Sequence, residues 1–184
     1  MQDKLLELFE GDSGQFIKVT LTGGQDERGK RQANYLTLHE PVTEDLWKDH
    51  LEGKYVIGLR PERDEKIKWG CIDVDPQNYK DYNSKKYIDI IKKNNLPLIP
   101  VRSKSGGLHI FLFLKDWEDK TETLKILHKW NNEYFMANEV FPMNKALGMP
   151  YFKAKMTTEF AYNDEGTPIM LEAFLEMAQL KRVT

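Results

Sequence analysis

The order of strands and helices from Ile67 onward limits, more than any other feature, what this chain can fold into. Four apolar segments are typical of strands, and two segments with apolar residues three and four positions apart are typical of helices. In chain order these are strand Trp69–Asp75, helix Ser84–Asn94, strands Leu98–Val101 and Leu108–Leu114, helix Thr121–Tyr134 and strand Glu139–Phe141. This β-α-β-β-α-β order predicts an α+β fold with a ferredoxin-like sheet.

The residues on either side of this unit predict further elements. Leu5–Phe9 has helical spacing, Gln15–Leu21 alternates polar and apolar residues as a half-buried strand does, and Thr43–Gly53 is typical of a helix with a threonine cap. Met170–Leu180 predicts a last helix. The run Gly23–Gln32 is too poor in apolar residues to pack, so we expect an exposed and mobile loop there.

Length, charge and cysteine content bound the class of protein. The 184 residues contain no Pro-, Gly- or Ser-rich linker, so we expect one domain, residues 1–184. Within it we expect an N-terminal α/β subdomain over 1–60, and the ferredoxin-like unit with a C-terminal helix over 61–184. The chain has 27 Lys and Arg against 29 Asp and Glu, so its net charge is not positive. Any affinity for nucleic acid must therefore come from a local excess of positive charge. The single cysteine, Cys71, fits a reducing compartment, and no apolar run is long enough to cross a membrane. We therefore expect a cytoplasmic protein.

Two acids at the end of the first predicted strand form the first candidate site. Residues two apart on a strand face the same side, so Asp73 and Asp75 project together, away from the apolar residues between them. In the usual strand order of this fold, 4-1-3-2, Glu139 and His109 would lie on either side of the pair. Three carboxylates make an all-oxygen site suited to Mg²⁺ or Mn²⁺. The alternative is a pair of turn or helix-cap acids, which would leave like charges side by side without compensation.

The segment Arg102–His109, Arg-Ser-Lys-Ser-Gly-Gly-Leu-His, forms the second candidate site. Its two glycines let the backbone approach a ligand and expose N–H groups to anionic oxygens. Cations and hydroxyl donors come from Arg102, Ser103, Lys104 and Ser105. The segment has the chemistry of a phosphate-binding loop, but it joins two strands and so is neither a P-loop nor a dinucleotide fingerprint. The alternative is an ordinary hairpin loop.

His109 interrupts an otherwise apolar strand and shares its side with Phe111 and Phe113. It can therefore reach the sheet face on which the acid pair lies, which we expect to be open. The alternative is a histidine satisfied within the core. We expect His50 and His128 to be surface residues of helices.

Local charge and aromatic residues point to the same part of the chain. The segment from Pro76 to Ser105 has seven Lys and Arg residues against two Asp residues, an excess that would attract phosphates, although the alternative is a solvated helix face. The aromatic candidates for stacking on bases are Tyr79, Tyr82, Tyr151 and Phe152, with core packing as the alternative for Phe152.

Together these motifs resemble those of a known family. Asp73-Val-Asp75, Ser-Gly-Gly-Leu-His109 and Glu139-Val-Phe-Pro142, in this order and on the predicted strands, resemble the three motifs of the archaeo-eukaryotic primase superfamily, the primase-polymerases. The resemblance is strongest to the primase domains of TOTE-type conflict systems and their phage relatives, and it extends to Met149-Pro-Tyr-Phe152. It implies a primase-polymerase catalytic core whose RRM-like palm is the βαββαβ unit.

The resemblance also implies a reaction. This is template-directed nucleotidyl transfer by a two-metal mechanism, with Asp73, Asp75 and Glu139 as catalytic residues that hold Mg²⁺ or Mn²⁺. The residues implied to bind the nucleoside triphosphate are His109, Ser103, Lys104 and Ser105, assisted by Arg102. The implied partners are a single-stranded DNA template and nucleoside triphosphates, with a helicase or accessory replication subunit for unwinding.

The chain departs from these relatives after Pro142. They carry Lys-Gln there and then a longer loop, whereas this chain reads Met143-Asn144-Lys145 before Gly148. A basic residue expected near the triphosphate is therefore missing at Met143. Either Lys145 takes over from a shifted position, or the site is weaker or altered.

Two other functions stay open. One is a catalytically inactive or partner-dependent RRM-like module that binds single-stranded nucleic acid, although an aromatic-rich RNA-binding strand is missing and three acids would repel a phosphate backbone. The other is a metal-dependent nuclease or replication initiator, although the four histidines are isolated and form no ligand pair. The sequence leaves open whether the product is RNA or DNA, and whether chains start without a primer.

Overall fold

The computed structural model describes residues 1–25, 31–78 and 80–184. Its helices and helical turns are α1 (Gln2–Leu8), α2 (Glu44–Glu52), η1 (Pro76–Asn78), α3 (Ser84–Lys93), α4 (Lys120–Trp130), the π-helical turn η2 (Asn131–Phe135), η3 (Ala154–Met156) and α5 (Leu171–Lys181). Its strands are β1 (Phe16–Gln25), β2 (Arg31–Leu38), β3 (Val56–Leu59), β4 (Glu62–Arg63), β5 (Lys66–Val74), β6 (Leu98–Arg102), β7 (Leu108–Asp119), β8 (Glu139–Phe141) and β9 (Leu147–Gly148). The α+β class is confirmed.

The β-α-β-β-α-β unit is present as β5, α3, β6, β7, α4 and β8. β5 pairs with β7 on one side and with β8 on the other, and β6 pairs with β7, all antiparallel. The resulting strand order, β8-β5-β7-β6, is the 4-1-3-2 order expected from the sequence.

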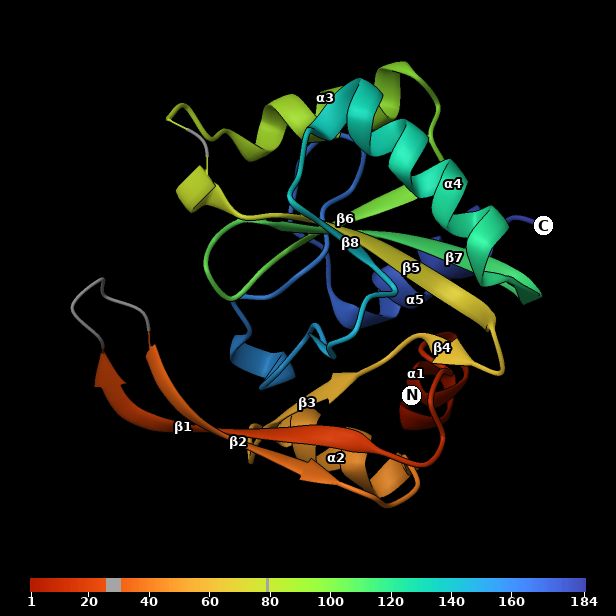
Figure 1. Cartoon of the computed structure of the whole chain (residues 1–184). Coiled ribbons are helices and arrows are strands. Elements are labelled where there is room, and N and C mark those ends of the chain that lie inside the picture. Colours follow the sequence, from red (N-terminus) through yellow and green to blue (C-terminus); the bar gives the residue numbers. More distant parts are fainter. Residues whose placement is uncertain (26–30, 79) are drawn as a thin grey trace.

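Helices α3 and α4 cover one face of this sheet (Figure 1). Their buried residues Tyr87, Ile91 and Leu127 pack with the strand residues Ile72 and Ile110 in one core cluster. The apolar spacing that predicts these helices therefore corresponds to the stripe that each helix buries.

The opposite face of the sheet is also covered, against expectation. Phe9, at the end of α1, packs edge-on against Phe111 and Phe113 with ring centroids 5.4 Å apart, and Phe174 of α5 packs on Phe113 at 6.1 Å. Both β7 phenylalanines are fully buried. The face predicted to be open is closed along most of its length because the first and last helices bury it. His109, near the start of β7, keeps a side chain that is 15% exposed.

A second sheet has the order β2-β1-β3-β9 and lies beneath the first in the view of Figure 1. Its strands β2, β3 and β9 were not predicted from the sequence. β9 brings the chain after Pro142 back to β3, where Gly148 pairs with Gly58 and Leu147 pairs with Leu59. The division into residues 1–60 and 61–184 stays a prediction.

The run Gly23–Gln32 is only partly a loop. Its first three residues belong to β1 and its last two to β2, so the prediction is wrong at both ends, and residues 26–30 lie outside the described residues. The two strands are joined by pairs such as Thr20 with Asn34. Backbone pairing extends the hairpin here because ladder hydrogen bonds do not require apolar side chains.

His50 is fully buried, so its assignment as a surface residue is wrong. Its Nδ1 accepts a hydrogen bond from the Ile57 N–H at 3.3 Å, which leaves Nε2 to donate to the Pro150 carbonyl at 2.8 Å. Burial lowers the pKa of His50 to about 4, so the ring is neutral at neutral pH. The histidine links α2 to β3 and to the segment after β9, whereas His128 is exposed as predicted.

Two element boundaries also differ from the prediction. β7 continues past Leu114 to Asp119 because its second half pairs with the start of β5. The predicted helix over 121–134 divides into α4 and the π-helical turn, where the Asn131 side chain hydrogen-bonds both the N–H and the carbonyl of Ala137. Among the described residues, no helix combines the length and apolar character needed to span a membrane.

Candidate active site

One end of the ferredoxin-like sheet brings together residues that are far apart in the sequence. In the strand register, Asp73 on β5 pairs with Glu139 on β8 and with His109 on β7. Side chains paired in this way share a face, with Cβ atoms about 4.5–5.5 Å apart. The Asp73 and Glu139 side chains are 21% and 34% exposed, so they reach solvent although most of this sheet face is buried. We call the side chains of Asp73, Asp75 and Glu139 the carboxylate row.

Asp75 follows directly after β5. Its Oδ1 accepts a hydrogen bond from the Gln77 N–H at 3.1 Å, so the carboxylate also caps the turn η1. The alternative role of a turn acid therefore applies to Asp75. Its charge nevertheless acts on Asp73, because it contributes to raising the pKa of that carboxyl.

The carboxylate row concentrates negative charge in a half-buried place. Burial, followed by the charges of Glu139 and Asp75, raises the pKa of Asp73 to about 6, against the opposing effect of Lys145. Burial lowers the pKa of His109 to about 4, so the neutral ring does not compensate Asp73 as a cation. His109 Nε2 and Asp73 Oδ1 are 3.7 Å apart, too far for a hydrogen bond.

Lys145 supplies a cation at this row. Its Nζ lies 2.5 Å from both Oε1 and Oε2 of Glu139. The ammonium also lies 5.7 Å from the centroid of the Phe141 ring. The structure therefore places Lys145 beside the carboxylates, as one of the two options from the sequence requires.

The donor chemistry of the row fits a hard divalent cation. Asp73, Asp75 and Glu139 offer only carboxylate oxygens, which Mg²⁺ and Mn²⁺ prefer, and their mutual repulsion favours a positive charge among them. These side chains are nevertheless not arranged as a formed metal site. Within residues 1–25, 31–78 and 80–184, no three His, Cys, Asp or Glu side chains lie in a group that could hold a metal ion. Glu139 is engaged by Lys145 instead.

The loop between β6 and β7 lies against the segment that carries Asp75. A Cβ added to Gly107 would lie 2.1 Å from the Val74 carbonyl oxygen and 2.6 Å from Cδ of Pro76, so only glycine fits. Gly106 has a φ of +87°, which glycine adopts without strain. The two glycines therefore bring this loop next to the carboxylate row.

The polar residues of the loop lie in different environments. Ser103 is buried, its N–H donates to the Gly107 carbonyl at 2.9 Å, and its Oγ lies 3.1 Å from that of Ser105, so it supports the turn. Arg102 donates from Nη1 to the Thr158 carbonyl at 2.9 Å, a contact that the sequence did not suggest. The most accessible of these residues are Lys104 and Ser105 at the loop tip.

Most of the aromatic residues that we expected to stack on bases pack inside the protein instead, as far as the structure describes them. Tyr151 is buried and its hydroxyl is hydrogen-bonded to two backbone groups, so this expectation is wrong. Phe152 packs on the His50 ring, with centroids 5.6 Å apart. Tyr82 is half-buried, and Tyr79 lies outside the described residues.

Surface ion pairs occupy part of the basic segment. Lys85 pairs with Asp89 at 2.8 Å and Lys92 with Glu165 at 3.4 Å. The alternative of a solvated helix face therefore holds for these two lysines.

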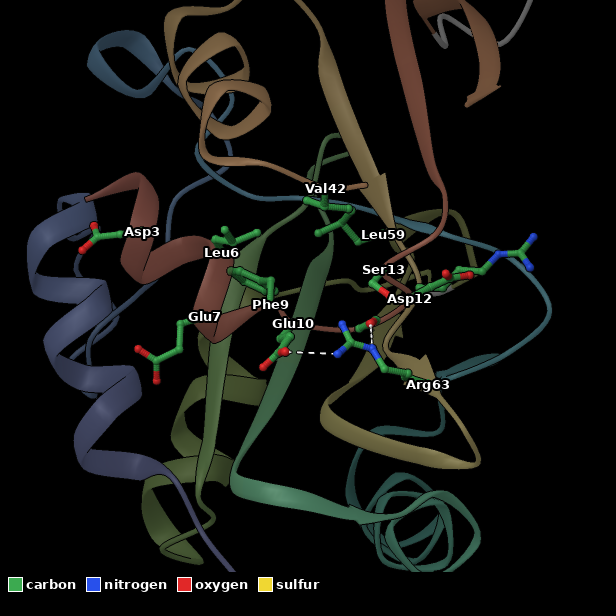
Figure 2. Close-up of a pocket in the computed structure, with 12 residues that line it drawn as sticks. Asp3, Leu6, Glu7, Phe9, Glu10, Asp12, Ser13, Val42, Leu59 and Arg63 are labelled. Carbon is green, nitrogen blue, oxygen red and sulfur yellow. Dashed lines mark hydrogen bonds and ion pairs between the residues drawn. The ribbon is translucent and has the colours of Figure 1, made fainter. Parts of the chain in front are cut away.

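A cavity of about 400 Å³ lies away from the carboxylate row, beside α1 (Figure 2). Apolar residues that line it include Leu6, Phe9, Val42 and Leu59. Several of its charged residues are paired: Arg63 Nη1 lies 3.2 Å from Glu10 Oε1, and Glu7 Oε1 lies 3.0 Å from Nη1 of Arg182. Because none of the candidate site residues lines it, we place the candidate active site at the carboxylate row.

Comparison with known proteins adds one match. The family model of the TOTE conflict system archaeo-eukaryotic primase domain matches residues 20–142, more than half of the chain. No curated protein matches the chain. The matched segment contains Asp73, Asp75, Glu139 and the loop Arg102–His109, and it ends before Lys145.

Proposed function

This chain belongs to the TOTE conflict system archaeo-eukaryotic primase domain family, and from that premise we propose that it is a primase-polymerase that copies single-stranded DNA from nucleoside triphosphates. Membership of the family supports primase-like nucleotidyl transfer as the class of reaction. The specific proposal is supported above all by the pairing of Asp73 with both Glu139 and His109 at an accessible end of the sheet.

The three carboxylates are the proposed ligands of Mg²⁺ or Mn²⁺. Asp73 on the central strand is flanked by Glu139 from β8 and by Asp75 beyond the strand end. Bound there, divalent cations would activate the attacking 3′-hydroxyl and neutralise charge on the triphosphate. With a pKa of about 6, Asp73 is mostly ionised at neutral pH and so is available as a ligand.

His109 is proposed to bind the triphosphate as a neutral group. Its low pKa keeps the ring uncharged, and a neutral imidazole carries one N–H that can donate to a phosphate oxygen. Because His109 pairs with Asp73 across the strands, that hydrogen bond would hold the phosphate beside the carboxylates.

The loop residues divide into two proposed roles. Lys104 and Ser105 at the tip would contact the triphosphate directly. Ser103 and Arg102 would hold the loop in place, through the Gly107 carbonyl and the Thr158 carbonyl respectively. Electrostatic stabilisation by positioned donors of this kind is the main contribution that a protein makes to phosphoryl transfer.

The alternative of an inactive or partner-dependent binding module has less support. RNA-recognition modules stack bases on exposed aromatic residues of the sheet. The corresponding β7 residues here, Phe111 and Phe113, are buried under α1 and α5. A helicase or accessory replication subunit stays a proposed partner for duplex templates.

The test is incorporation of labelled nucleotide on single-stranded DNA, with and without a primer, in Mg²⁺ and in Mn²⁺. We expect metal-dependent product from the wild-type protein and a loss of about 10²-fold or more in Asp73→Asn. Asp116→Asn is the matched control, because Asp116 is an exposed acid of β7 outside the carboxylate row, and it should keep full activity.

The primer distinguishes the two forms of the activity. Product without a primer would identify a primase, and product only with a primer a polymerase. No product from folded protein that still binds single-stranded DNA would contradict the proposal and favour the binding module.

A further inference from the structure

Lys145 engages the carboxylate that the proposed reaction needs. Its Nζ contacts both oxygens of Glu139 at 2.5 Å, and the two side chains are 48% and 34% exposed. The same ammonium opposes the rise in the pKa of Asp73. One protein cation therefore compensates part of the charge of the carboxylate row.

The place of Lys145 in the chain limits what its side chain can reach. It lies between β8 of one sheet and β9 of the other. Its N–H donates to the Met143 carbonyl at 2.7 Å, and Leu147 is already paired with Leu59. The backbone is held on both sides of Lys145, so its reach is set by the rotations of a flexible four-carbon side chain.

An ammonium and a divalent cation compete for the same oxygens of Glu139. A carboxylate whose two oxygens are both contacted by Nζ has fewer lone pairs to offer a second cation. Like charges at this distance also repel each other. Ligation of a cation by Glu139 therefore favours movement of the Lys145 ammonium away from this carboxylate, and the backbone, held on both sides of Lys145, keeps the released ammonium near the row.

Resting on the proposed function, we infer that Lys145 is a positioning residue that couples cation binding to triphosphate binding. In the free protein it is the counter-ion of Glu139 and weakens the cation site. When cation and triphosphate are both bound, the displaced ammonium pairs with phosphate oxygens, which are strong partners for lysine. Each ligand therefore raises the affinity for the other.

Mn²⁺ binding measured by electron paramagnetic resonance tests this inference without catalysis. Lys145→Met should tighten Mn²⁺ binding to the nucleotide-free protein about ten-fold, which corresponds to about 1.4 kcal/mol. It should also reduce the gain in affinity that Mn²⁺ gives to a non-hydrolysable nucleoside triphosphate. Lys145→Arg retains the charge and should stay close to wild type. Lys129→Met, at an exposed lysine of α4, is the control and should change neither quantity.

The outcomes separate this inference from the proposed function. If wild-type protein binds Mn²⁺ and Asp73→Asn abolishes that binding, the carboxylate site exists. In that case, unchanged or weaker Mn²⁺ binding by folded Lys145→Met overturns the role of Lys145 alone. No Mn²⁺ binding that depends on Asp73 overturns the proposed function, and the inference with it.

Discussion

Replacing Asp73 by Asn should stabilise the protein in the absence of divalent cations. The ordinary pKa of Asp, 3.8, rises to about 6 in the folded protein, first through burial and then through Glu139 and Asp75. Between these two pH values the folded state keeps a proton that the unfolded state has released, so stability falls as pH rises and stays reduced above pH 6. The separation of the pKa values corresponds to about 3 kcal/mol. We expect a gain of about 1–3 kcal/mol, because the partly exposed carboxylate is also screened by solvent.

Urea denaturation in EDTA, repeated from about pH 4 to pH 8, measures this effect. The stability difference between Asp73→Asn and wild type should be small near pH 4 and reach its full value above about pH 6. The exposed Asp116→Asn variant should follow the wild-type profile throughout. A destabilised Asp73→Asn protein at neutral pH, or a difference that does not vary with pH, would refute the argument that the carboxylate row is poorly compensated.

Three further predictions concern the segments that hold the site. Burial lowers the pKa of His50 from 6.5 to about 4, so the folded protein holds the ring in its neutral form. The free energy of unfolding should therefore decrease as pH falls from about 6.5 through 4, and an NMR titration of the ring should give the low pKa. Gly107→Ala forces a Cβ against the Val74 carbonyl and should cost about 1–3 kcal/mol in thermal denaturation, whereas Gly106→Ala, limited mainly by its positive φ, should cost about 1 kcal/mol. Lys104→Met should raise KM for nucleotide with little change in melting temperature. Ser103→Ala should instead lower stability by about 1 kcal/mol with little change in KM, and equal effects of the two variants on KM and on stability would contradict the division of roles.

The palm could be predicted from the sequence because each of its elements carries a local pattern. Strands such as Leu108–Leu114 are apolar enough to be recognised alone, and helices such as α3 bury a regular stripe. The strand order then follows from the β-α-β-β-α-β succession, which is why the pairing of Asp73 with Glu139 and His109 could be anticipated.

Only β1 of the second sheet could be predicted, from the alternation over Gln15–Leu21, because β2 and β9 lack such a local pattern. β2 is mostly exposed and mixes polar with apolar residues, and β9 is only two residues long, so each depends on its partner strand for its conformation. The error at His50 has a similar cause, because its partner Pro150 is remote in the sequence and its other partner, Ile57, lies on β3, which was not predicted. A local pattern carries no information about such partners.

The expectation of an open sheet face was wrong for a related reason. The alternation along β7 correctly separates the two faces of the strand, but it does not say what covers each face. Phe111 and Phe113 could have been taken as exposed stacking residues or as core, and only the packing of Phe9 and Phe174 decides between them. The contact of Lys145 with Glu139 likewise depends on how β9 returns the chain to the other sheet.

A double-mutant cycle on nucleotide incorporation tests the central claim most directly, namely that Asp73 and Glu139 form one metal-dependent site although they come from different strands. The rates of wild type, Asp73→Asn, Glu139→Gln and the double variant would be measured on primed single-stranded DNA with Mn²⁺. Residues that act as a unit have strongly non-additive effects. We therefore predict that each single variant loses about 10²-fold or more and that the double variant loses little beyond that. Two losses that multiply, or a Glu139→Gln protein with wild-type activity, would contradict the account.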